Sequence, residues 1–306
     1  MILSASRRTD IPAFFSEWFF KRIEEGVVFV RNPFNRQQVS KIVLSPDLID
    51  CIVFWTKNPS DAFIEKLPRL DELGYKYYFQ FTLTSYDQTI EKNVSRKKEV
   101  IEKFRQISKR VGRERIIWRY DPILLSAHFN LEYHKKYFEY LARALSPYTE
   151  KCIISFLDFY SKIEKVLSTQ GVSRMTPEEM TALAGIISSI AARYNLKVET
   201  CCEEIDLSQF GITKSHCIDG EMIQKITGKD IGFKQDKNQR VGCGCVSSVD
   251  IGVYNSCRHN CIYCYANRSC DVQISDSVRI TPTTSGASPE SSFERARKQV
   301  FGFRFK

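Results

Sequence analysis

Six short apolar segments recur along the first two-thirds of the chain, at 2–6, 51–55, 77–83, 115–119, 152–157 and 196–201. They are rich in β-branched and aromatic residues, so we predict a strand at each of them. Several do not alternate between apolar and polar positions, and 51–55 is apolar throughout. Near-continuous apolar strands are typical of a parallel sheet covered on both faces.

Helix signals lie between these strands. Thr176-Pro-Glu-Glu179 offers a hydroxyl cap, a proline in the first turn and two carboxylates at the start of a predicted helix. Further helices are predicted over 14–25 and 60–74, each closed by a glycine. The segment 96–115 contains nine Lys or Arg residues around an apolar stripe with helical spacing, so we interpret the charges as a solvated outer face.

The remaining pattern defines the domain organisation. Residues 27–30 and 39–44 flank the turn-prone Asn32-Pro-Phe-Asn35, which predicts an inserted β-hairpin. The repeated βα units predict one α/β domain over 1–267, a TIM-barrel-like or partial barrel of about six units. Residues 268–306 shift to Ser, Thr, Pro and basic residues, which predicts a loose tail.

Composition narrows the class of protein. Of 306 residues, 43% are hydrophobic and 26% are charged, which excludes a disordered chain. No apolar run is long enough for a membrane span, and the first residues lack the order of a secretory signal, so we expect a cytoplasmic protein with no membrane partner. The net charge of +9 suits an anionic substrate, an acidic redox partner or nucleic acid, and does not choose among them.

Cysteine is the unusual component, because nine of the 11 cysteines fall between 201 and 270. Such crowding in a reducing cytoplasm favours thiolates held by metal. The sharpest motif is the C-x3-C-x2-C triad of Cys257, Cys261 and Cys264. Three thiolates on one loop can hold three irons of a [4Fe-4S] cluster, whereas zinc pairs usually form two separated C-x2-C halves. We therefore favour iron–sulfur over zinc or structural thiols.

The triad resembles the signature of radical S-adenosylmethionine enzymes, including the aromatic Tyr263 before the last cysteine, His259 within the motif and Tyr-Ala after it. The chain up to about residue 267 also resembles a bacterial family of domains of unknown function with a C-terminal cysteine cluster of this kind. The segments that carry this resemblance are 4–12, 54–59, 117–122, 242–245 and the triad. The residues after 267 fall outside it.

This resemblance implies a mechanism and its participants. A [4Fe-4S] cluster on the triad would bind S-adenosylmethionine at its open iron, take an electron from a ferredoxin or flavodoxin, and cleave the cofactor to a 5'-deoxyadenosyl radical. The radical would act on an unidentified polar or anionic substrate. The usual position of such a triad is after the first barrel strand, whereas here a short predicted strand at 249–254 precedes it. A circularly permuted barrel would produce this order, because the first and last strands of a barrel are neighbours.

A second set of cysteines lies upstream of the triad. Cys201, Cys217, Cys243 and Cys245 could ligate a second iron–sulfur cluster or a structural zinc, and the glycines around the C-x-C pair would let its backbone bend around a metal. The alternative is a group of buried or incidental thiols. Cys51 and Cys152 each begin an apolar strand and are interpreted as core residues. Cys202 and Cys270 have no predicted partner.

Polar residues follow the predicted strands, where the chemistry of a parallel barrel belongs. As candidate catalytic residues we take Arg7, Arg8, Asp10, Lys57, Arg119 and Asp121, and as candidate cofactor-binding residues Asn58, Asp158, Glu203 and Tyr263. Arg and Lys could bind a carboxylate, and Asp or Glu could hold ribose hydroxyls or an amino group. Each of them alone could equally be a surface ion pair or a loop cap.

Two other functions stay open from the sequence. One is a nucleic-acid repair or modification enzyme with the same cluster, suggested by the net charge and by Trp55, Trp118 and Tyr120 near strand ends. The other is a non-enzymatic iron–sulfur or zinc module for redox sensing or structure. No P-loop, dinucleotide-binding glycine motif or Ser-His-Asp context is found.

Overall fold

The computed structural model describes residues 1–35, 37–237, 239–240 and 242–267, all of which belong to one compact unit. The predicted tail at 268–306, with Cys270, lies outside the described residues. Eight strands form one sheet in the order β10-β1-β4-β5-β6-β7-β8-β9, and every neighbouring pair is parallel. They are β1 (Ile2–Ala5), β4 (Cys51–Thr56), β5 (Tyr77–Thr82), β6 (Ile116–Ile123), β7 (Lys151–Phe156), β8 (Lys197–Cys201), β9 (Thr213–Ser215) and β10 (Val249–Asp250).

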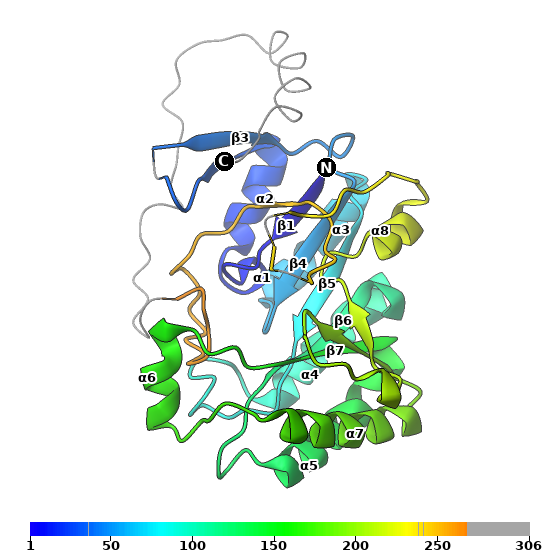
Figure 1. The fold of residues 1–306 in the computed structure, drawn as a ribbon. Coiled ribbons are helices and arrows are strands. Elements are labelled where there is room, and N and C mark those ends of the chain that lie inside the picture. Colours follow the sequence, from blue (N-terminus) through cyan, green and yellow to red (C-terminus); the bar gives the residue numbers. More distant parts are fainter. Residues whose placement is uncertain (36, 238, 241, 268–306) are drawn as a thin grey trace. The chain divides into compact units, whose positions relative to one another are not determined.

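Helices connect these strands (Figure 1). They are α1 (Ile11–Phe14), α2 (Ser16–Glu25), α3 (Asp61–Glu72), α4 (Lys97–Val111), α5 (Leu131–Leu145), α6 (Ser161–Thr169), α7 (Pro177–Arg193) and α8 (Gly220–Thr227), with short 3₁₀ turns at Arg113–Arg115, Ser146–Tyr148 and Ser208–Phe210. The predicted hairpin is confirmed as β2 (Val27–Arg31) and β3 (Val39–Val43), which pair antiparallel. Thr176 forms a capping box with Glu179, and α2 ends at Gly26 with a φ of 67°, which glycine adopts without strain.

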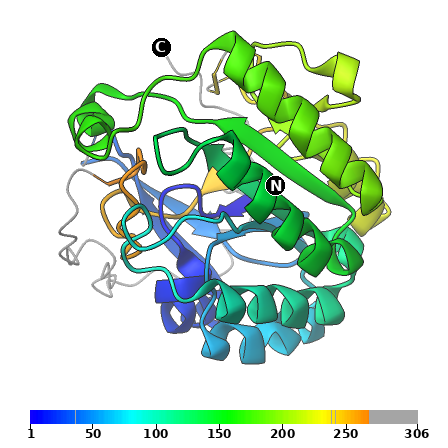
Figure 2. The same ribbon diagram turned by 90° about the horizontal axis from the view of Figure 1, so that it is seen from below.

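Both faces of the central part of the sheet are buried, which is why strands such as β4 are largely apolar. On the outer face, aromatic side chains pack against helices: Phe54 contacts Phe63 of α3, and Trp118 stacks on Phe138 of α5 with ring centroids 5.0 Å apart. Figure 2 shows these helices around the outside of the sheet. The predicted core cysteines, Cys51 and Cys152, are fully buried.

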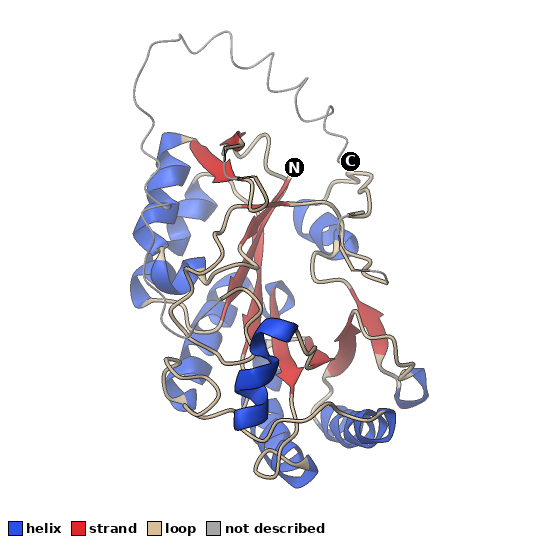
Figure 3. Cartoon of the chain, turned by 60° about the vertical axis from the view of Figure 1, so that its left-hand side comes forward, coloured by secondary structure: helices blue, strands red, loops and turns tan. Residues whose placement is uncertain are grey.

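The inner face carries a second apolar cluster, formed by alternate residues of the strands and by residues of α8 and the segment around it. Tyr78, Ile117 and Ile153 of the sheet pack there with Ile218 and Ile223. In Figure 3, α8 lies on the opposite side of the sheet from α2 and α3. The segment 216–246 thus covers the inside of the sheet, where a barrel would have its interior.

Two features of the sheet differ from the expectation. The sheet has eight strands, whereas the sequence predicts about six βα units. Strand β9 is missed from the sequence because it is a short polar strand with no apolar signal. In the described part of the chain β10 and β9 are the two edges, so the sheet is an open, mixed α/β arrangement without the closure of a complete barrel. The predicted strand at 249–254 forms only over two residues. Within the same described residues, no helix is both long and apolar enough to cross a bilayer.

Candidate metal-binding site at the carboxyl edge of the sheet

The cysteine triad lies on the loop 251–267, which we call the triad loop. It follows β10, and β10 pairs with β1, with Ser4 opposite Asp250. The loop also bonds to the segment that follows β5, since Ile262 N donates to Ile90 O at 3.0 Å. Because parallel strands end at the same edge of a sheet, these contacts hold the triad at the carboxyl edge, where the predicted strand-end residues lie.

Backbone N–H groups point at two of the three triad sulfurs. Asp10 and His259 donate backbone N–H groups to Cys257 Sγ. Ala266 and Asn267 donate theirs to Cys264 Sγ. Burial raises the pKa of Cys257 to about 12, against the effect of these donors. Burial likewise raises the pKa of Cys261, and the ammonium of Lys57 opposes it.

These thiols suit an iron–sulfur cluster in donor type and surroundings, because hydrogen bonds to sulfur accompany thiolates that ligate such clusters. Among the described residues, no three or more His, Cys, Asp or Glu side chains surround one point ready for a metal ion, so ligation requires the thiols to rotate towards it. Polar atoms around the triad are also available to a ligand. Asn58 Oδ1, His259 Nδ1, Asn260 Oδ1 and Asn267 Oδ1 are buried and have no hydrogen-bond partner among the described residues.

Asp10 joins three parts of this edge. Its Oδ2 accepts from His259 Nε2 at 2.8 Å, from Lys57 N at 2.7 Å and from Thr56 Oγ1 at 3.1 Å. Its Oδ1 caps α1 by accepting from Ala13 N at 3.0 Å. The carboxylate of this predicted catalytic residue therefore accepts hydrogen bonds from other groups of the protein. These bonds fix His259 of the triad loop beside the ends of β1 and β4.

Glu91 is the centre of the edge and is absent from the sequence predictions. It is 1% exposed, and its carboxylate contacts Lys57 Nζ at 2.6 Å and Lys97 Nζ at 2.6 Å. Thr84 Oγ1 donates to the same carboxylate at 2.6 Å, and so does the hydroxyl of Tyr263. Burial alone would raise the pKa of Glu91, but the two ammonium groups hold that pKa below its ordinary value. Nothing local distinguishes this single Glu in a polar loop.

Asp250 gathers the residues after β1 in a similar way. Ser4 Oγ donates to it at 3.0 Å, and the backbone N–H of Arg7 donates at 2.8 Å. The guanidinium groups of Arg7 and Arg8 approach it more distantly, at 3.9 and 4.0 Å. Arg8 also lies over the ring of Tyr254, 5.2 Å from its centroid. The two predicted catalytic arginines therefore lie next to the strand that leads into the triad loop.

Arg119 and Asp121 form a largely buried ion pair within β6, which continues to Ile123, so these two residues do not follow their strand as predicted. Arg119 Nε donates to Asp121 Oδ2 at 2.9 Å, and Nη1 donates to Gln80 Oε1 at 3.3 Å and to Cys217 Sγ at 3.1 Å. The guanidinium also lies over the ring of Trp55, 5.5 Å from its centroid. This pair therefore connects the inner face of the sheet with the upstream cysteines.

The other predicted cofactor-binding residues lie apart from one another. Asn58 follows Lys57 at the end of β4 and donates to Ser95 Oγ at 2.9 Å. Asp158 pairs with Arg240, and about half of each side chain is exposed. Glu203 accepts from Phe156 N at 2.9 Å, and burial raises the pKa of Glu203 to about 7. Asp158 follows β7, and the residues on either side of it, Leu157 and Phe159, pack in one apolar cluster with Tyr263 of the triad loop. Glu203 follows β8, the next strand of the sheet.

The four upstream cysteines meet on the inner face of the sheet. Cys201 Sγ and Cys217 Sγ are 2.7 Å apart, Cys217 contacts Cys245, and Cys245 contacts Cys243. Cys202, for which no partner was predicted, contacts Cys243. The structure thus places the four cysteines in one row with Cys202 beside it, and metal binding by the four stays a prediction.

Two of the three aromatic residues that suggested nucleic-acid binding belong to the core. Trp118 and Tyr120 are at most 1% exposed and pack against Phe138 of α5 on the outer face of the sheet. Stacking on a base requires an accessible ring face, so this part of the sequence interpretation is wrong. Successive residues of a strand point to opposite faces of the sheet. Because Arg119 points inward, Trp118 and Tyr120 on either side of it point outward into the helix-covered core.

Comparison with known proteins gives a family and little else. Residues 2–266 match the model of a family described as a domain of unknown function (DUF1848). No curated protein matches the chain. One solved structure, of a proposed alpha-L-fucosidase from Bacteroides thetaiotaomicron, is similar over 61% of this chain and 76% of its own, at 12% identity and a TM-score of 0.24. A TM-score this low supports no inference about fold or function.

Proposed function

The chain belongs to the DUF1848 family, and we propose that it is a radical S-adenosylmethionine-like enzyme with its cluster site on Cys257, Cys261 and Cys264. The observation that carries this proposal is the place of the triad loop. It follows a strand that pairs in parallel with β1, and it lies at the carboxyl edge beside buried charged residues. In such a sheet the loops at this edge are the usual place for chemistry.

The strand order supports a permuted barrel. In an unpermuted arrangement, the strand before the triad would come first in the chain and pair with the next strand. Here β10 comes last and pairs with β1, so the spatial order is kept while the chain order changes. We propose that the open sheet is a partial barrel of this kind, with segment 216–246 in its interior.

When bound, a [4Fe-4S] cluster with S-adenosylmethionine would supply a 5'-deoxyadenosyl radical after one-electron reduction. The protein's own part is to hold and surround these groups. The three thiols lose their protons on ligation, and the N–H groups on Cys257 and Cys264 stabilise the resulting negative charge. The amide oxygens of Asn58, Asn260 and Asn267 are buried, have no partner within the described part of the chain, and are suited to accept from an amino group or hydroxyl of the cofactor.

Other charged residues at the carboxyl edge of the sheet position the side chains around the triad. Glu91 fixes Lys57 and Tyr263 next to Cys261, and Asp10 fixes His259. Arg119 and Asp121, farther along the sheet, bond to each other, and Arg119 also reaches Cys217, so this pair organises the inner face beside the edge. We expect a cytoplasmic protein that receives its electron from a ferredoxin or flavodoxin.

The test is the formation of 5'-deoxyadenosine. The protein is reconstituted anaerobically with iron and sulfide, reduced with dithionite and incubated with S-adenosylmethionine. We expect the nucleoside from the wild type, none from Cys257→Ala or Cys261→Ala, and a wild-type amount from Cys152→Ala, which removes a core thiol far from the triad. A wild-type protein that retains its iron and releases no nucleoside would contradict the proposal, and a protein that takes up only zinc would favour the non-enzymatic module.

A further inference from the structure

We propose that Cys201, Cys217, Cys243 and Cys245 form a second metal centre, distinct from the triad and independent of the function proposed above. All four thiols lie in one row of sulfur contacts on the inner face of the sheet, which runs from Cys201 through Cys217 and Cys245 to Cys243. Three chain segments supply them: the end of β8, the residues before α8, and the C-x-C loop.

These thiols differ from cysteines that merely fill a core. Cys51 and Cys152 are also fully buried, and their sulfurs contact backbone groups, including the carbonyl of the next residue in the same strand at 3.7 and 3.9 Å. By contrast, Cys201 and Cys217 face each other's sulfur, and Cys217 receives a guanidinium N–H as well. The chain therefore contains two kinds of thiol in its core, and those of the second kind contact one another in a row.

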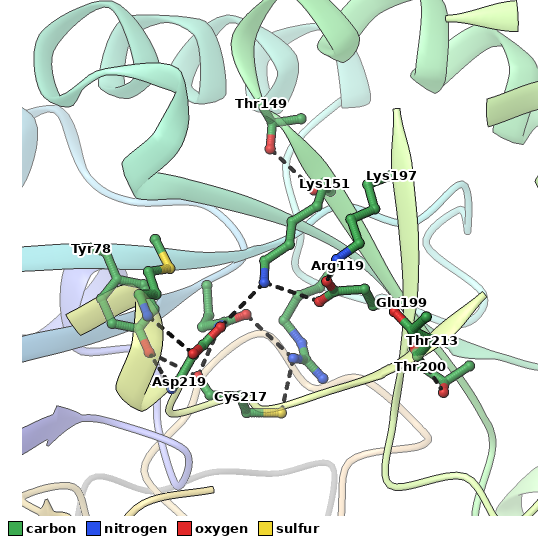
Figure 4. Close-up of polar contacts among 12 residues, drawn as sticks. Tyr78, Arg119, Thr149, Lys151, Lys197, Glu199, Thr200, Thr213, Cys217 and Asp219 are labelled. Atoms are coloured by element: carbon green, nitrogen blue, oxygen red, sulfur yellow. Dashed lines mark hydrogen bonds and ion pairs between the residues drawn. The ribbon is translucent and has the colours of Figure 1, made fainter. Parts of the chain in front are cut away.

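Cys217 is held by bonds from both sides. Its carbonyl oxygen accepts from Tyr78 Oη at 3.0 Å and from Gln80 Nε2 at 2.8 Å, while Arg119 Nη1 reaches its sulfur at 3.1 Å. Figure 4 shows Arg119 pointing at Cys217. The backbone of Cys217 is therefore fixed on the inner face of the sheet, with its sulfur next to a cation.

The segment after Cys217 is anchored to the sheet by a buried charge network. Asp219 caps α8 by accepting from Met222 N at 3.1 Å, and its carboxylate contacts Lys151 Nζ at 3.4 Å. Lys151 also pairs with Glu199 of β8 at 3.0 Å, as Figure 4 shows. The network ties the α8 segment to β7 and β8, and so keeps Cys217 beside the end of β8.

The C-x-C loop packs closely against the residues on either side of Cys217, His216 and Ile218. A Cβ at Gly244 would lie 1.9 Å from the ring of His216, so a side chain there requires that ring to move. The backbone N–H of Ile218 donates to Cys245 Sγ at 3.4 Å. Cys202, which contacts Cys243, has a φ of 59°, a conformation that non-glycine residues adopt rarely.

Four thiolates select a soft metal, either zinc or an iron–sulfur cluster, and the two share this donor chemistry. On ligation each thiol gives its proton to solvent as its sulfur–metal bond forms, so no electron donor or acceptor is needed for binding. The resulting centre is negatively charged, and Arg119 beside Cys217 offsets part of that charge inside the protein. The four cysteine side chains would reach a shared zinc ion or iron–sulfur cluster by rotating between staggered rotamers.

The experiment separates this centre from the triad. Protein is purified anaerobically, without added metal, as the triple variant Cys257→Ser/Cys261→Ser/Cys264→Ser, and its zinc, iron and sulfide are counted. We expect about one zinc ion, or about four irons with sulfide, per chain. Adding Cys243→Ser/Cys245→Ser to this background should remove the metal. Because the triad is absent throughout, failure of the proposed enzymatic function leaves this result unaffected.

Two controls keep the outcome interpretable. In the triad-free background, Cys51→Ala/Cys152→Ala removes two thiols outside the set and should retain the metal, and so should Cys202→Ser. If the C-x-C variant does not fold, thiols are titrated in the native triad-free protein before and after a strong chelator, and about four additional thiols should become reactive.

Three results would overturn the second centre. The first is a triad-free protein that contains no metal after anaerobic purification. The second is a disulfide between Cys201 and Cys217 in that protein, found by mass spectrometry without reductant. The third is metal that stays bound when both Cys243 and Cys245 are replaced.

Discussion

Replacing Glu91 by Gln tests whether one buried carboxylate holds the candidate site together. The side chain keeps its shape, but Lys57 and Lys97 lose the negative charge that each contacts at 2.6 Å. At that distance and an effective dielectric constant of about 20, each pair attracts by about 6 kcal/mol before desolvation is subtracted. Breaking a buried pair by removing one partner typically costs about 3–5 kcal/mol, because the remaining charge stays buried without compensation.

We therefore expect Glu91→Gln to lower the free energy of unfolding by about 3–5 kcal/mol, measured by urea denaturation at neutral pH. The matched control is Glu17→Gln. Glu17 contacts Lys66 at 2.5 Å, but its side chain is 75% exposed, so the same chemical change should cost at most about 1 kcal/mol.

A loss of less than about 1 kcal/mol in Glu91→Gln, or one equal to that of the control, would refute the reasoning. Iron retention gives a second measurement. Glu91 forms a β-bridge with Cys261, and its carboxylate receives the hydroxyl of Tyr263. After reconstitution and desalting, Glu91→Gln should keep less iron than Glu17→Gln. Equal retention would show that Glu91 stabilises the fold without positioning the triad.

Three further outcomes are expected. Burial lowers the pKa of His134 to about 4, below its unfolded value of about 6.5, so the stability it contributes is complete above about pH 6.5 and is lost as pH falls towards 4. Urea denaturation should show a loss of up to about 3 kcal/mol over that range, and His134→Gln should remove this slope. Gly244→Ala should cost about 1–3 kcal/mol in the thermal or urea unfolding of the protein, and His216→Ala in the same chain should restore most of it; no rescue would contradict the close packing. Asp10→Asn should reduce iron retention at the triad, because it weakens the bond to His259, and unchanged retention with unchanged electron paramagnetic resonance would refute that role.

The fold was largely predictable because its strands carry a local signal. Segments such as 51–55 are apolar at every position, since both faces of the sheet are buried, and the structure confirms strands there. Thr213–Ser215 could not be found in this way, because β9 is a polar edge strand with two exposed residues of three. Its pairing with β8 depends on the segment that follows it, which covers the inner face of the sheet.

The candidate site was predictable only where its chemistry is rare. Cysteine is an uncommon residue, so its clusters could be recognised at once, and the four upstream thiols do meet. Acidic residues are common, and their role depends on burial. Asp158 follows β7 at the expected edge and pairs at the surface with Arg240, whereas Glu91 has no motif and lies at the centre of the charges. Position after a strand predicts the edge, but not the direction of the side chain.

Asp250 connects the last described strand, β10, to the first residues of the chain. Its carboxylate receives Ser4 Oγ and the backbone N–H of Arg7, so the strand before the triad is fixed by the residues that open the chain. Asp10, a few residues later, fixes His259 inside the triad loop. Each contact joins segments about 250 residues apart, and no local pattern encodes it. The geometry of the triad therefore depends on the pairing of β10 with β1, and a change on either strand should disturb the cysteines without touching them.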